Sequence, residues 1–592
     1  MIVHNSHDEF YRYPLTPVCC GEKVRLRLSY DGAGRVNLRT WSGSESIYPM
    51  KNIGDNTYEC EIQAPDTPSQ LWYCFYIDED FTRHIYGNNP DMLGGEGRLY
   101  ESYFHSYLIV VYDQNFSTPE YLHTGNVYQI FPDRFRRGNY EPDSTVPDRI
   151  EREWHNEPML VKDKANGDNY AHDFFMGNLR GIVEKLDYLY DLGIRTIYLN
   201  PIFKAGTNHR YDTGDYEQID SYLGNNDEFV LLCDEAKKRG MHIMLDGVFS
   251  HSGNDSKYFN QKGTYKELGA YQSKESPYYK WYTFNQYPDN YQSWWGIYTL
   301  PVLNKNEPSL RNYMLNAETG IVAKWLKMGA NAWRLDVADE LPVDFLQELR
   351  KTAKQTKADC AIVGEVWEDA SAKASYGETR CYCLGDTLDS VMNYPLRHAI
   401  IQFLTQKINA YDLERFVNHQ KEVYPYPFHY ATMNILGSHD KARPLNVLCG
   451  EDHSGASREM NKRVKISVEQ YTLAYRRYIQ AVALISALPG SPCIYYGDEA
   501  GVQGTADPWN RRVYPWGYED RSLIREISAI LNHRLENRLL QVGFMDAKAI
   551  DENTIKIRRY VDNAKDVFGR ACENDEICFT LNRNEEHFSW TK

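Results

Sequence analysis

Short apolar stretches alternate with longer amphipathic segments from about residue 120 onward, and this alternation limits the possible folds more than any other feature. Alternating strands and helices build parallel βαβ units, whose buried strands are continuously apolar. Eight stretches have the length of such strands, and eight is the number that closes a (β/α)8 barrel. They are residues 127–131, 196–199, 242–246, 332–336, 361–365, 388–392, 432–436 and 493–496. We therefore predict an α/β fold with a (β/α)8 TIM barrel over residues 119–520.

The segments between these strands support the count. Amphipathic runs over residues 178–192, 227–239 and 310–328 predict helices, and each run ends directly before a glycine. Glycine at this position can adopt the left-handed conformation that commonly ends a helix. Residues 252–305, after the third strand, are too long and too rich in tyrosine and tryptophan for a simple loop. We predict an inserted subdomain there, beside the strand ends.

The two ends of the chain have a different pattern. Within residues 1–118, runs of alternating polar and apolar residues such as 24–28 and 71–77 are separated by turn residues. This pattern is typical of antiparallel strands with one buried face, so we predict an N-terminal β-sandwich. Residues 521–592 begin with the last barrel helix and continue with alternating residues. We predict a C-terminal β-rich domain there.

Charge and composition narrow the class of partners. The 66 Lys+Arg and 82 Asp+Glu give a formal net charge of −16, which argues against nucleic acid or an anionic membrane as the main partner. No stretch approaches the roughly 18 apolar residues that a membrane-spanning helix needs. The given N-terminus has no basic region followed by an apolar run, and the 12 cysteines have no zinc-type spacing. We expect a cytoplasmic protein with free thiols.

Acidic residues follow the ends of several predicted strands. Asp246 ends the third strand, Asp336 the fourth and Glu365 the fifth, and Asp440 lies just past the seventh. The C-terminal ends of barrel strands converge on one pocket, so we expect these side chains to meet. Two carboxyl groups roughly 5 Å apart suit a retaining glycosidase, in which one is the nucleophile and the other the proton donor.

Basic side chains join these acids. Arg334 lies two residues before Asp336, so both side chains face the same side of the strand. A neighbouring cation keeps a carboxylate ionised, as a nucleophile requires, although a structural ion pair explains the same pattern. His251 and His439 also follow strands, and histidine with aspartate builds hydrolytic metal sites. Because no His-x-His occurs at the first strand, we rank metal-dependent hydrolysis below glycoside chemistry.

Four motifs match a known family in the expected order. They are DGVFSH at 246–251, WRLDVA at 333–338, GEVW at 364–367 and LGSHD at 436–440. Each motif is weak alone, but four in order on the corresponding strands of a barrel are a strong signal. The chain thus resembles glycoside hydrolase family 13, the α-amylase family, over essentially its whole length. The N-terminal β-domain, residues 300–304 and the pair Asp339-Glu340 look most like the branch of neopullulanases, cyclomaltodextrinases and maltogenic amylases.

The resemblance implies a role for each matching residue. Asp336 would be the nucleophile that forms a covalent β-glycosyl intermediate, Glu365 the general acid/base, and Asp440 a carboxylate that binds sugar hydroxyls more tightly in the transition state. Asp246 would mainly organise its neighbours by hydrogen bonds. The residues implied in substrate binding are Tyr211 beneath the sugar, Arg443 on the donor side, Trp367 and Glu340 on the acceptor side, and Arg334, His251 and His439 around the reacting centre.

The chain also departs from the family pattern at possible calcium ligands. Ser250 stands where many amylases have an asparagine that helps to bind an interdomain calcium ion. Residues 137–143 align with a calcium loop of this branch, but Arg137 and Pro142 occupy ligand positions and cannot coordinate calcium through their side chains. We predict this site weakened or absent, and no required cofactor or metal. Glu368 replaces a common histidine, which leaves the acceptor preference open.

The resemblance further implies an activity. We expect hydrolysis of α-1,4 links in malto-oligosaccharides, cyclodextrins or pullulan, with some transglycosylation. An α-glucosidase, an α-1,6-acting enzyme and an inactive carbohydrate-binding protein are the alternatives, and the retention of all three acids argues against the last. In this branch the N-terminal domain packs across a partner's active site. We therefore expect α-glucan oligosaccharides as substrates and a homodimer formed through the N-terminal domain.

Overall fold

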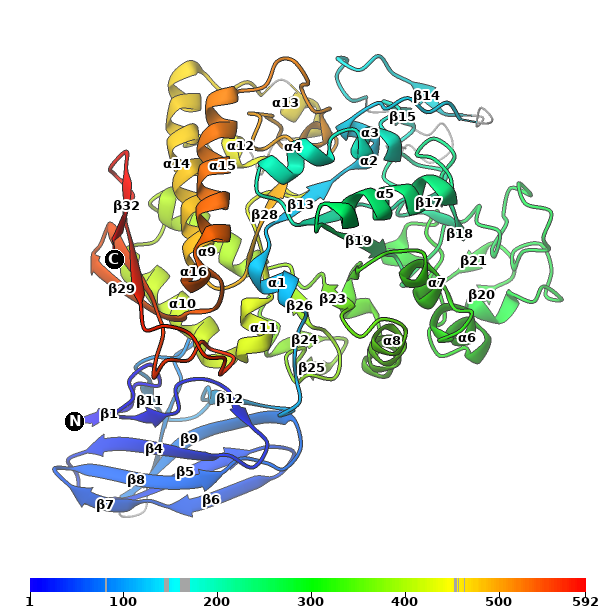
Figure 1. Ribbon diagram of the computed structural model, residues 1–592. Coiled ribbons are helices and arrows are strands. Elements are labelled where there is room, and N and C mark those ends of the chain that lie inside the picture. Colours follow the sequence, from blue (N-terminus) through cyan, green and yellow to red (C-terminus); the bar gives the residue numbers. More distant parts are fainter. Residues whose placement is uncertain are drawn as a thin grey trace.

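The centre of the molecule is a sheet of parallel strands that closes on itself (Figure 1). The computed structural model describes residues 1–591 except 80–81, 143–147, 160–170, 452–454, 456 and 463. In chain order the strands are β13 (Val127–Ile130), β16 (Thr196–Leu199), β19 (His242–Gly247), β22 (Ala332–Leu335), β23 (Ala361–Gly364), β26 (Ser390–Val391), β27 (Met433–Ile435) and β28 (Ser491–Tyr495). A parallel bridge between Met392 and Met433 joins the two ends of this sheet. The predicted barrel is confirmed.

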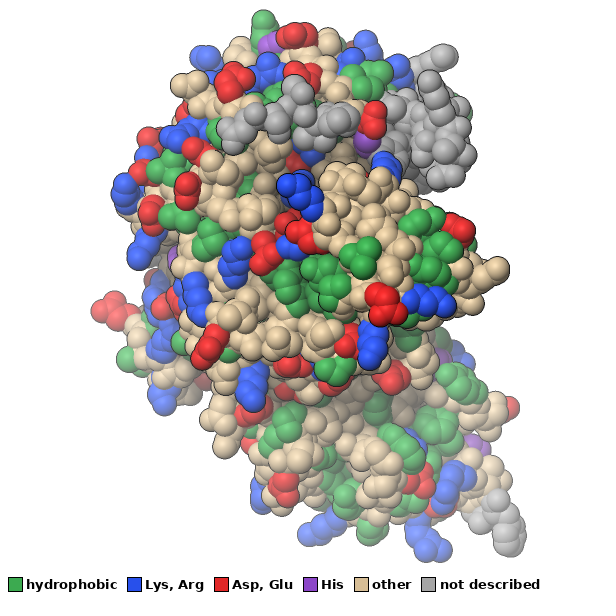
Figure 2. All heavy atoms as spheres, turned by 90° about the vertical axis from the view of Figure 1, so that its right-hand side faces the viewer, with side chains coloured by type: hydrophobic (Ala, Val, Ile, Leu, Met, Phe, Trp, Pro, Cys, Tyr) green, Lys and Arg blue, Asp and Glu red, His purple; other side chains and the backbone are tan. Residues whose placement is uncertain are grey.

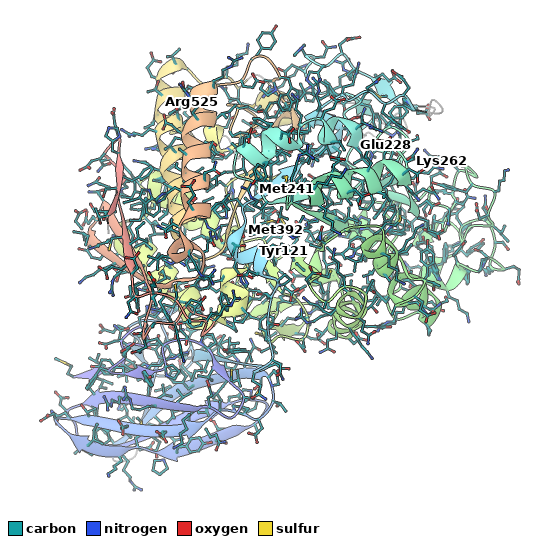
Figure 3. The ribbon with its side chains drawn as sticks, viewed as in Figure 1. Tyr121, Glu228, Met241, Lys262, Met392 and Arg525 are labelled. Atoms are coloured by element: carbon teal, nitrogen blue, oxygen red, sulfur yellow. The ribbon has the colours of Figure 1, made fainter. Side chains whose placement is uncertain are left out.

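Apolar side chains fill the barrel, and amphipathic helices cover it. Tyr198, Met244 and Met392 belong to a buried cluster inside the barrel, and Tyr121 of α1 (Glu120–Thr124) packs against it (Figure 3). Most helices outside bury one apolar stripe, as period 3.6 dictates, whereas α14 (Val468–Ala487) is buried on all sides from Arg477 to Ala487. They include α5 (Asn226–Lys238), α8 (Val343–Thr356), α9 (Tyr394–Leu404), α10 (Ala410–Val423), α14 (Val468–Ala487), α15 (Arg521–Glu536) and α16 (Arg538–Val542).

Two of the three predicted helices are each divided into two shorter helices, so the prediction of single helices was wrong there. Residues 178–192 form α3 (Leu179–Val183) and α4 (Leu186–Asp191), because Lys185 leaves the helical conformation with φ −112°. Residues 310–328 form α6 (Pro308–Leu315) and α7 (Ile321–Lys327). Here the Asn316 side chain accepts hydrogen bonds from the backbone N–H groups of Glu318 and Thr319, and this local bonding competes with the helix.

The inserted subdomain after β19 is made of short elements around aromatic side chains. They are the 3-10 turns η1 (Tyr279–Trp281) and η2 (Trp294–Gly296) and the hairpin of β20 (Phe284–Gln286) and β21 (Asn290–Tyr291). Phe259 is fully buried and packs against Tyr282 and Tyr291. The subdomain projects from one side of the barrel, and hydrophobic, acidic and basic side chains are interspersed on that face (Figure 2).

The N-terminal part is a sandwich of two mainly antiparallel sheets, as predicted. One sheet contains β1 (Ile2–Val3), β2 (Arg12–Tyr13), β4 (Lys23–Tyr30), β7 (Lys51–Gly54) and β8 (Thr57–Gln63). The other contains β3 (Val18–Cys19), β5 (Arg35–Trp41), β6 (Glu45–Pro49), β9 (Ser69–Glu79), β10 (Thr82–Gly87), β11 (Arg98–Tyr100) and β12 (Tyr107–Tyr112). Alternate residues of these strands, such as Val24, Leu26 and Leu28, face a common core.

A buried charge cluster joins this sandwich to the barrel. Arg12 pairs with Glu422 of α10, and His7 Nε2 lies 3.0 Å from the same carboxylate. Burial opposes ionisation of Glu422, but Arg12 and His7 outweigh it and lower the pKa of Glu422 to about 2. The two parts of the chain are therefore held together by a pair that is costly to break.

The chain ends in an antiparallel sheet beside the barrel (Figure 1). Its strands are β29 (Phe544–Asp551), β30 (Thr554–Tyr560), β31 (Glu576–Asn582) and β32 (Phe588–Thr591). The predicted fold class, a TIM barrel with an insertion and flanking β-domains, is confirmed; the domain boundaries at residues 118 and 520 stay predictions. Every helix in the described ranges is too short or too polar to cross a membrane.

Candidate active site

The C-terminal ends of β19, β22 and β23 hold one guanidinium group among three carboxyl groups. Arg334 Nη1 lies 2.7 Å from Asp246 Oδ1 and 3.0 Å from Asp336 Oδ1. Arg334 Nη2 lies 2.8 Å from Glu365 Oε2, and the Arg334 side chain is completely buried. Because one planar group contacts all three acids, Asp336 and Glu365 are held side by side at the strand ends.

Burial is the strongest influence on these carboxyl groups. It raises the pKa of Asp246 and of Glu365, and it raises the pKa of Asp336 well above the ordinary value. Arg334 lowers all three pKa values, but one positive charge cannot balance three negative charges. We expected Arg334 to keep Asp336 ionised, whereas burial outweighs it. The three carboxyl groups together therefore retain a proton to higher pH than exposed acids do. A site that needs one protonated acid and one carboxylate requires such retention.

The backbone just after Asp336 is strained in a way that serves Glu365. Val337 has φ 40°, a left-handed conformation that is rare for a β-branched residue. In this conformation the Val337 N–H donates to Glu365 Oε2 over 2.8 Å. The Trp367 indole donates to the other oxygen, Oε1, over 3.1 Å. Both oxygens of Glu365 are thus fixed in place, which is consistent with strain stored at a functional site.

An aromatic ring and a histidine lie beside the acids. The Tyr211 hydroxyl donates to Asp246 Oδ2 over 2.8 Å, and its ring stacks on His439 with a centroid separation of 5.2 Å. His439 Nε2 lies 3.1 Å from Asp440 Oδ2. Burial lowers the pKa of His439 well below its ordinary value, so the ring is neutral and can exchange hydrogen bonds with a neutral ligand. Asp246 also accepts hydrogen bonds from Tyr198 and Arg334, and its expected role of organising these neighbours stays a prediction.

These groups form part of a cleft with a volume of about 1150 Å³. The predicted site residues that line it are Tyr211, His251, Asp336, Glu340, Glu365, Trp367, His439 and Asp440. Arg334 does not line the cleft itself but contacts the lining residues Asp336, Glu365 and Tyr211. His251 is held by Ser250 Oγ, 2.8 Å from its Nδ1, and by the Tyr211 carbonyl oxygen, 3.1 Å from its Nε2. The structure thus brings together nine of the ten predicted residues, and their individual roles stay predictions.

Comparison with known proteins agrees with this geometry. The family described as "Alpha amylase, catalytic domain" matches residues 129–559. The chain belongs to the α-amylase family. The amylopullulanase of Thermoanaerobacter thermohydrosulfuricus is 35% identical over 98% of this chain and 42% of its own length. The cyclomaltodextrinase of Thermoanaerobacter pseudethanolicus is 30% identical over 92% of this chain and 87% of its own length.

A solved structure supports the same assignment. The cyclic α-maltosyl-(1→6)-maltose hydrolase of Arthrobacter globiformis, in complex with its cyclic ligand, is 29% identical with a TM-score of 0.64. The match covers 79% of this chain and 92% of that one. Together with the cyclomaltodextrinases and maltogenic amylases, these relatives place the chain in the branch that the motifs indicated. The chain spans less than half of the length of the amylopullulanases that it matches.

The one predicted residue that the structure does not bring into the cleft is Arg443. Its side chain is fully buried, donates to the carbonyl oxygens of Tyr496 and Asn510, and pairs with Asp498 at 2.8 Å. Arg511 lines the cleft instead, with Nη2 3.8 Å from Asp440 Oδ1. Sequence reasoning missed Arg511 because it lies in a loop well past the last barrel strand, where the strand-end rule gives no signal.

Of three further residues near the site, one contacts Trp367 from outside the cleft lining and two line the cleft. Lys441 Nζ lies 3.9 Å from the centre of the Trp367 ring, and Trp367 stacks on Tyr394 at 4.3 Å. Trp295 and Tyr376 are exposed side chains that also line the cleft. The abundance of aromatic residues in the insertion predicted such platforms in general, but not which rings would face the cleft.

The residues at the expected calcium positions of an α-amylase do not fit calcium here. Lys305 Nζ lies 3.4 Å from the Ser250 carbonyl oxygen, so an ammonium group lies directly beside this residue, and the Ser250 hydroxyl contacts His251 Nδ1. Burial lowers the pKa of Lys305 to about 8, which leaves it mainly charged at neutral pH. Arg137 donates to the carbonyl oxygens of Arg152 and Phe175, each over 3.2 Å. A divalent cation would meet like charge at both places. Asp143, the last residue of the aligned loop, lies outside the described residues.

Proposed function

We propose that this chain is a retaining α-glucan hydrolase that cleaves α-1,4-glucosidic bonds in cyclodextrins, pullulan and malto-oligosaccharides, with some transglycosylation. The observation that carries the proposal is the position of Asp336 and Glu365, which contact the two nitrogens of one buried guanidinium at the bottom of a partly aromatic cleft. Relatives named cyclomaltodextrinase, maltogenic amylase and amylopullulanase support the substrate class.

The proposed reaction has two steps at the same carbon. Asp336 attacks the anomeric carbon while Glu365 protonates the departing glycosidic oxygen, so that a covalent glycosyl-enzyme forms. Glu365 then takes a proton from water, which attacks the same carbon and releases Asp336. Two inversions retain the α-configuration. Asp440 and the neutral His439 would hold sugar hydroxyls, and Tyr211 would support the ring that flattens in the transition state.

The direct test is to incubate the protein with β-cyclodextrin, pullulan and starch and to follow the anomers of the first products by NMR. We expect α-anomers to form first and to mutarotate later. First products of the β-configuration would contradict retention. Absence of turnover on every α-glucan would contradict the enzymatic proposal and favour a carbohydrate-binding protein, the alternative from another class. Relative rates on α-1,4- and α-1,6-linked substrates distinguish the proposed α-1,4 specificity from the α-1,6-acting alternative, for which the α-1,6 link would be cleaved faster.

We also propose a homodimer formed through the N-terminal sandwich. That sandwich contributes no residue to the lining of the cleft in the described part of the chain, so it could narrow the cleft only on a partner. Trp41 and Ile47 are exposed on the paired strands β5 and β6 and offer apolar side chains for such contact. Light scattering should give the mass of two chains. A monomer with unchanged substrate preference after removal of residues 1–118 would contradict the proposal.

A cytoplasmic location is the last part of the proposal. All twelve cysteines lie in described positions and are free, which is typical of proteins in reducing compartments. Fractionation of producing cells should find the protein with cytoplasmic markers, and its appearance in the medium of intact cells would contradict this.

A further inference from the structure

Two exposed aromatic side chains hydrogen-bond to the same carboxylate oxygen at one end of the cleft. The Trp295 indole donates to Glu340 Oε1 over 3.3 Å, and the Tyr376 hydroxyl donates to the same atom. Trp295 belongs to the inserted subdomain, whereas Tyr376 follows β23 in the chain. Two walls of the cleft that come from distant parts of the sequence therefore meet at Glu340. We call these three residues the clasp.

The backbone of both aromatic residues is unusual. Trp295 and Tyr376 each have φ 50°, and each is followed by a glycine that also has a positive φ. Tyr376 and Gly377 form the two-residue turn between β24 (Lys373–Ser375) and β25 (Glu378–Arg380). Glycine, asparagine and aspartate are the residues that favour such turns. Since the two rings are 79% and 68% exposed, burial does not explain their positions, and outliers of this kind are typical of ligand clamps.

One side of the clasp is rigidly mounted. Arg380 Nη1 donates to the carbonyl oxygens of Asp339 and Leu341 over 2.9 and 3.0 Å. The Tyr382 hydroxyl donates to Asp339 Oδ1 over 2.6 Å. These bonds fix the β24–β25 hairpin to the turn that carries Glu340. The Tyr376 ring and the Glu340 carboxylate consequently form one unit, and Trp295 approaches it from the other wall.

The clasp is connected to the part of the site that holds Glu365, the proposed acid. In the proposed reaction Glu365 protonates the leaving oxygen, and the segment that directly follows Glu365 carries Trp367 and leads to Tyr376. Glu340 ends the turn η3 (Ala338–Glu340), which directly follows Val337, the residue whose N–H donates to Glu365 Oε2. The glucose units released in the first step therefore extend toward the clasp.

We propose that the clasp closes this end of the cleft and limits how many glucose units can extend beyond the cleaved bond, an inference that rests on the proposed hydrolysis. The indole nitrogen and the phenol oxygen are both within hydrogen-bonding distance of one atom, so the gap between them is narrower than a pyranose ring with its hydroxyl groups. Short linear malto-oligosaccharides end before the clasp. A long linear chain such as amylose must first displace it, and the enzyme therefore prefers short chains.

The test compares kcat/KM for amylose and for maltotetraose in the wild type and in two conservative variants. Trp295→Phe and Tyr376→Phe keep an aromatic ring but remove the hydrogen-bond donor. Each should raise the amylose-to-maltotetraose ratio on the order of 2- to 10-fold, the factor that one net hydrogen bond supplies. Tyr518→Phe is the matched control, because Tyr518 is 79% exposed and does not line the cleft. Its ratio should equal that of the wild type.

Other outcomes contradict the clasp. A lower ratio in Trp295→Phe or Tyr376→Phe would show that the pair binds long chains rather than excluding them. An unchanged ratio in both variants, with active wild type, would contradict the clasp and leave the proposed hydrolysis intact. A wild type that cleaves neither substrate, nor cyclodextrin or pullulan, would contradict the proposed function and the clasp together.

Discussion

Replacing Arg334 by leucine should destabilise the protein strongly and in a pH-dependent way. Arg334 is fully buried and contacts Asp246, Asp336 and Glu365 at 2.7, 3.0 and 2.8 Å. Leucine fills part of the volume but leaves three buried acids without a positive partner. Removing one partner of a buried ion pair typically costs about 3–5 kcal/mol. We expect a loss of free energy of unfolding of at least that order at pH 8.

The sign of the pH dependence follows from the carboxyl groups. Burial raises the pKa of all three and Arg334 lowers it, so the variant has still higher values in the folded state. The folded variant then binds more protons than the unfolded chain, whose carboxyl groups titrate near pH 4. Its free energy of unfolding therefore falls as pH rises through the folded pKa values. The deficit relative to wild type should be larger at pH 8 than at pH 5.

Urea unfolding or thermal melting of both proteins at pH 5, 6.5 and 8 measures this deficit. Arg534→Leu is a matched control, because Arg534 is equally buried but donates mainly to backbone carbonyl groups. It should destabilise by an amount that is constant over this pH range, since the pKa of Arg534, lowered by burial, is still about 9. A deficit for Arg334→Leu that is small, or that does not grow with pH, would refute the reasoning.

Further expectations concern the acid, the sandwich contact and calcium. Trp367→Phe removes a hydrogen-bond donor that lowers the pKa of Glu365, so the alkaline limb of the kcat/KM profile should move to higher pH. An unchanged alkaline limb would contradict an effect of Trp367 on the pKa of the acid. Glu422→Gln leaves Arg12 buried without its partner and should cost about 3–5 kcal/mol at neutral pH. The pKa of Glu422 is about 2 in the folded protein, so the wild type should lose this part of its free energy of unfolding as pH falls from about 4 toward 2. The variant has no such carboxylate and should not show this loss. Parallel plots of the free energy of unfolding against pH would contradict the expectation. EDTA should change neither activity nor melting temperature, because Lys305 and Arg137 place positive charge at the expected calcium positions; a loss restored by calcium would contradict that assignment.

Much of the fold was accessible from the sequence because barrel strands are short, continuously apolar and regularly spaced. The strand ends then located Asp246, Asp336 and Glu365, since the topology brings such ends together whatever the details of packing. The break at Asn316 was not accessible, because its cause is a side chain that bonds to nearby backbone, and an asparagine can also continue a helix. Propensity alone does not tell the two cases apart.

The remaining misses have a common physical origin in long loops. The sequence does not tell Arg443, which is buried against Asp498, from Arg511, which reaches the cleft, because loop packing decides between them. Tyr376 was missed for the same reason, since its position depends on a left-handed backbone conformation that aromatic residues rarely adopt. The electrostatics of the site could be anticipated only in part. The contact of Arg334 with Asp336 followed from strand alternation. That burial outweighs Arg334 in setting the pKa of Asp336 could be seen only from the folded structure.

The most direct test of the central claim is to trap the covalent intermediate. In Glu365→Gln, α-maltosyl fluoride can still react, because fluoride leaves without protonation, while attack of water lacks its general base and should slow by about 10²- to 10⁴-fold. Mass spectrometry of the protein and of its peptic peptides should then find one maltosyl group bonded to Asp336. A glycosyl group on any other residue, or none while fluoride is released with inversion, would contradict the account.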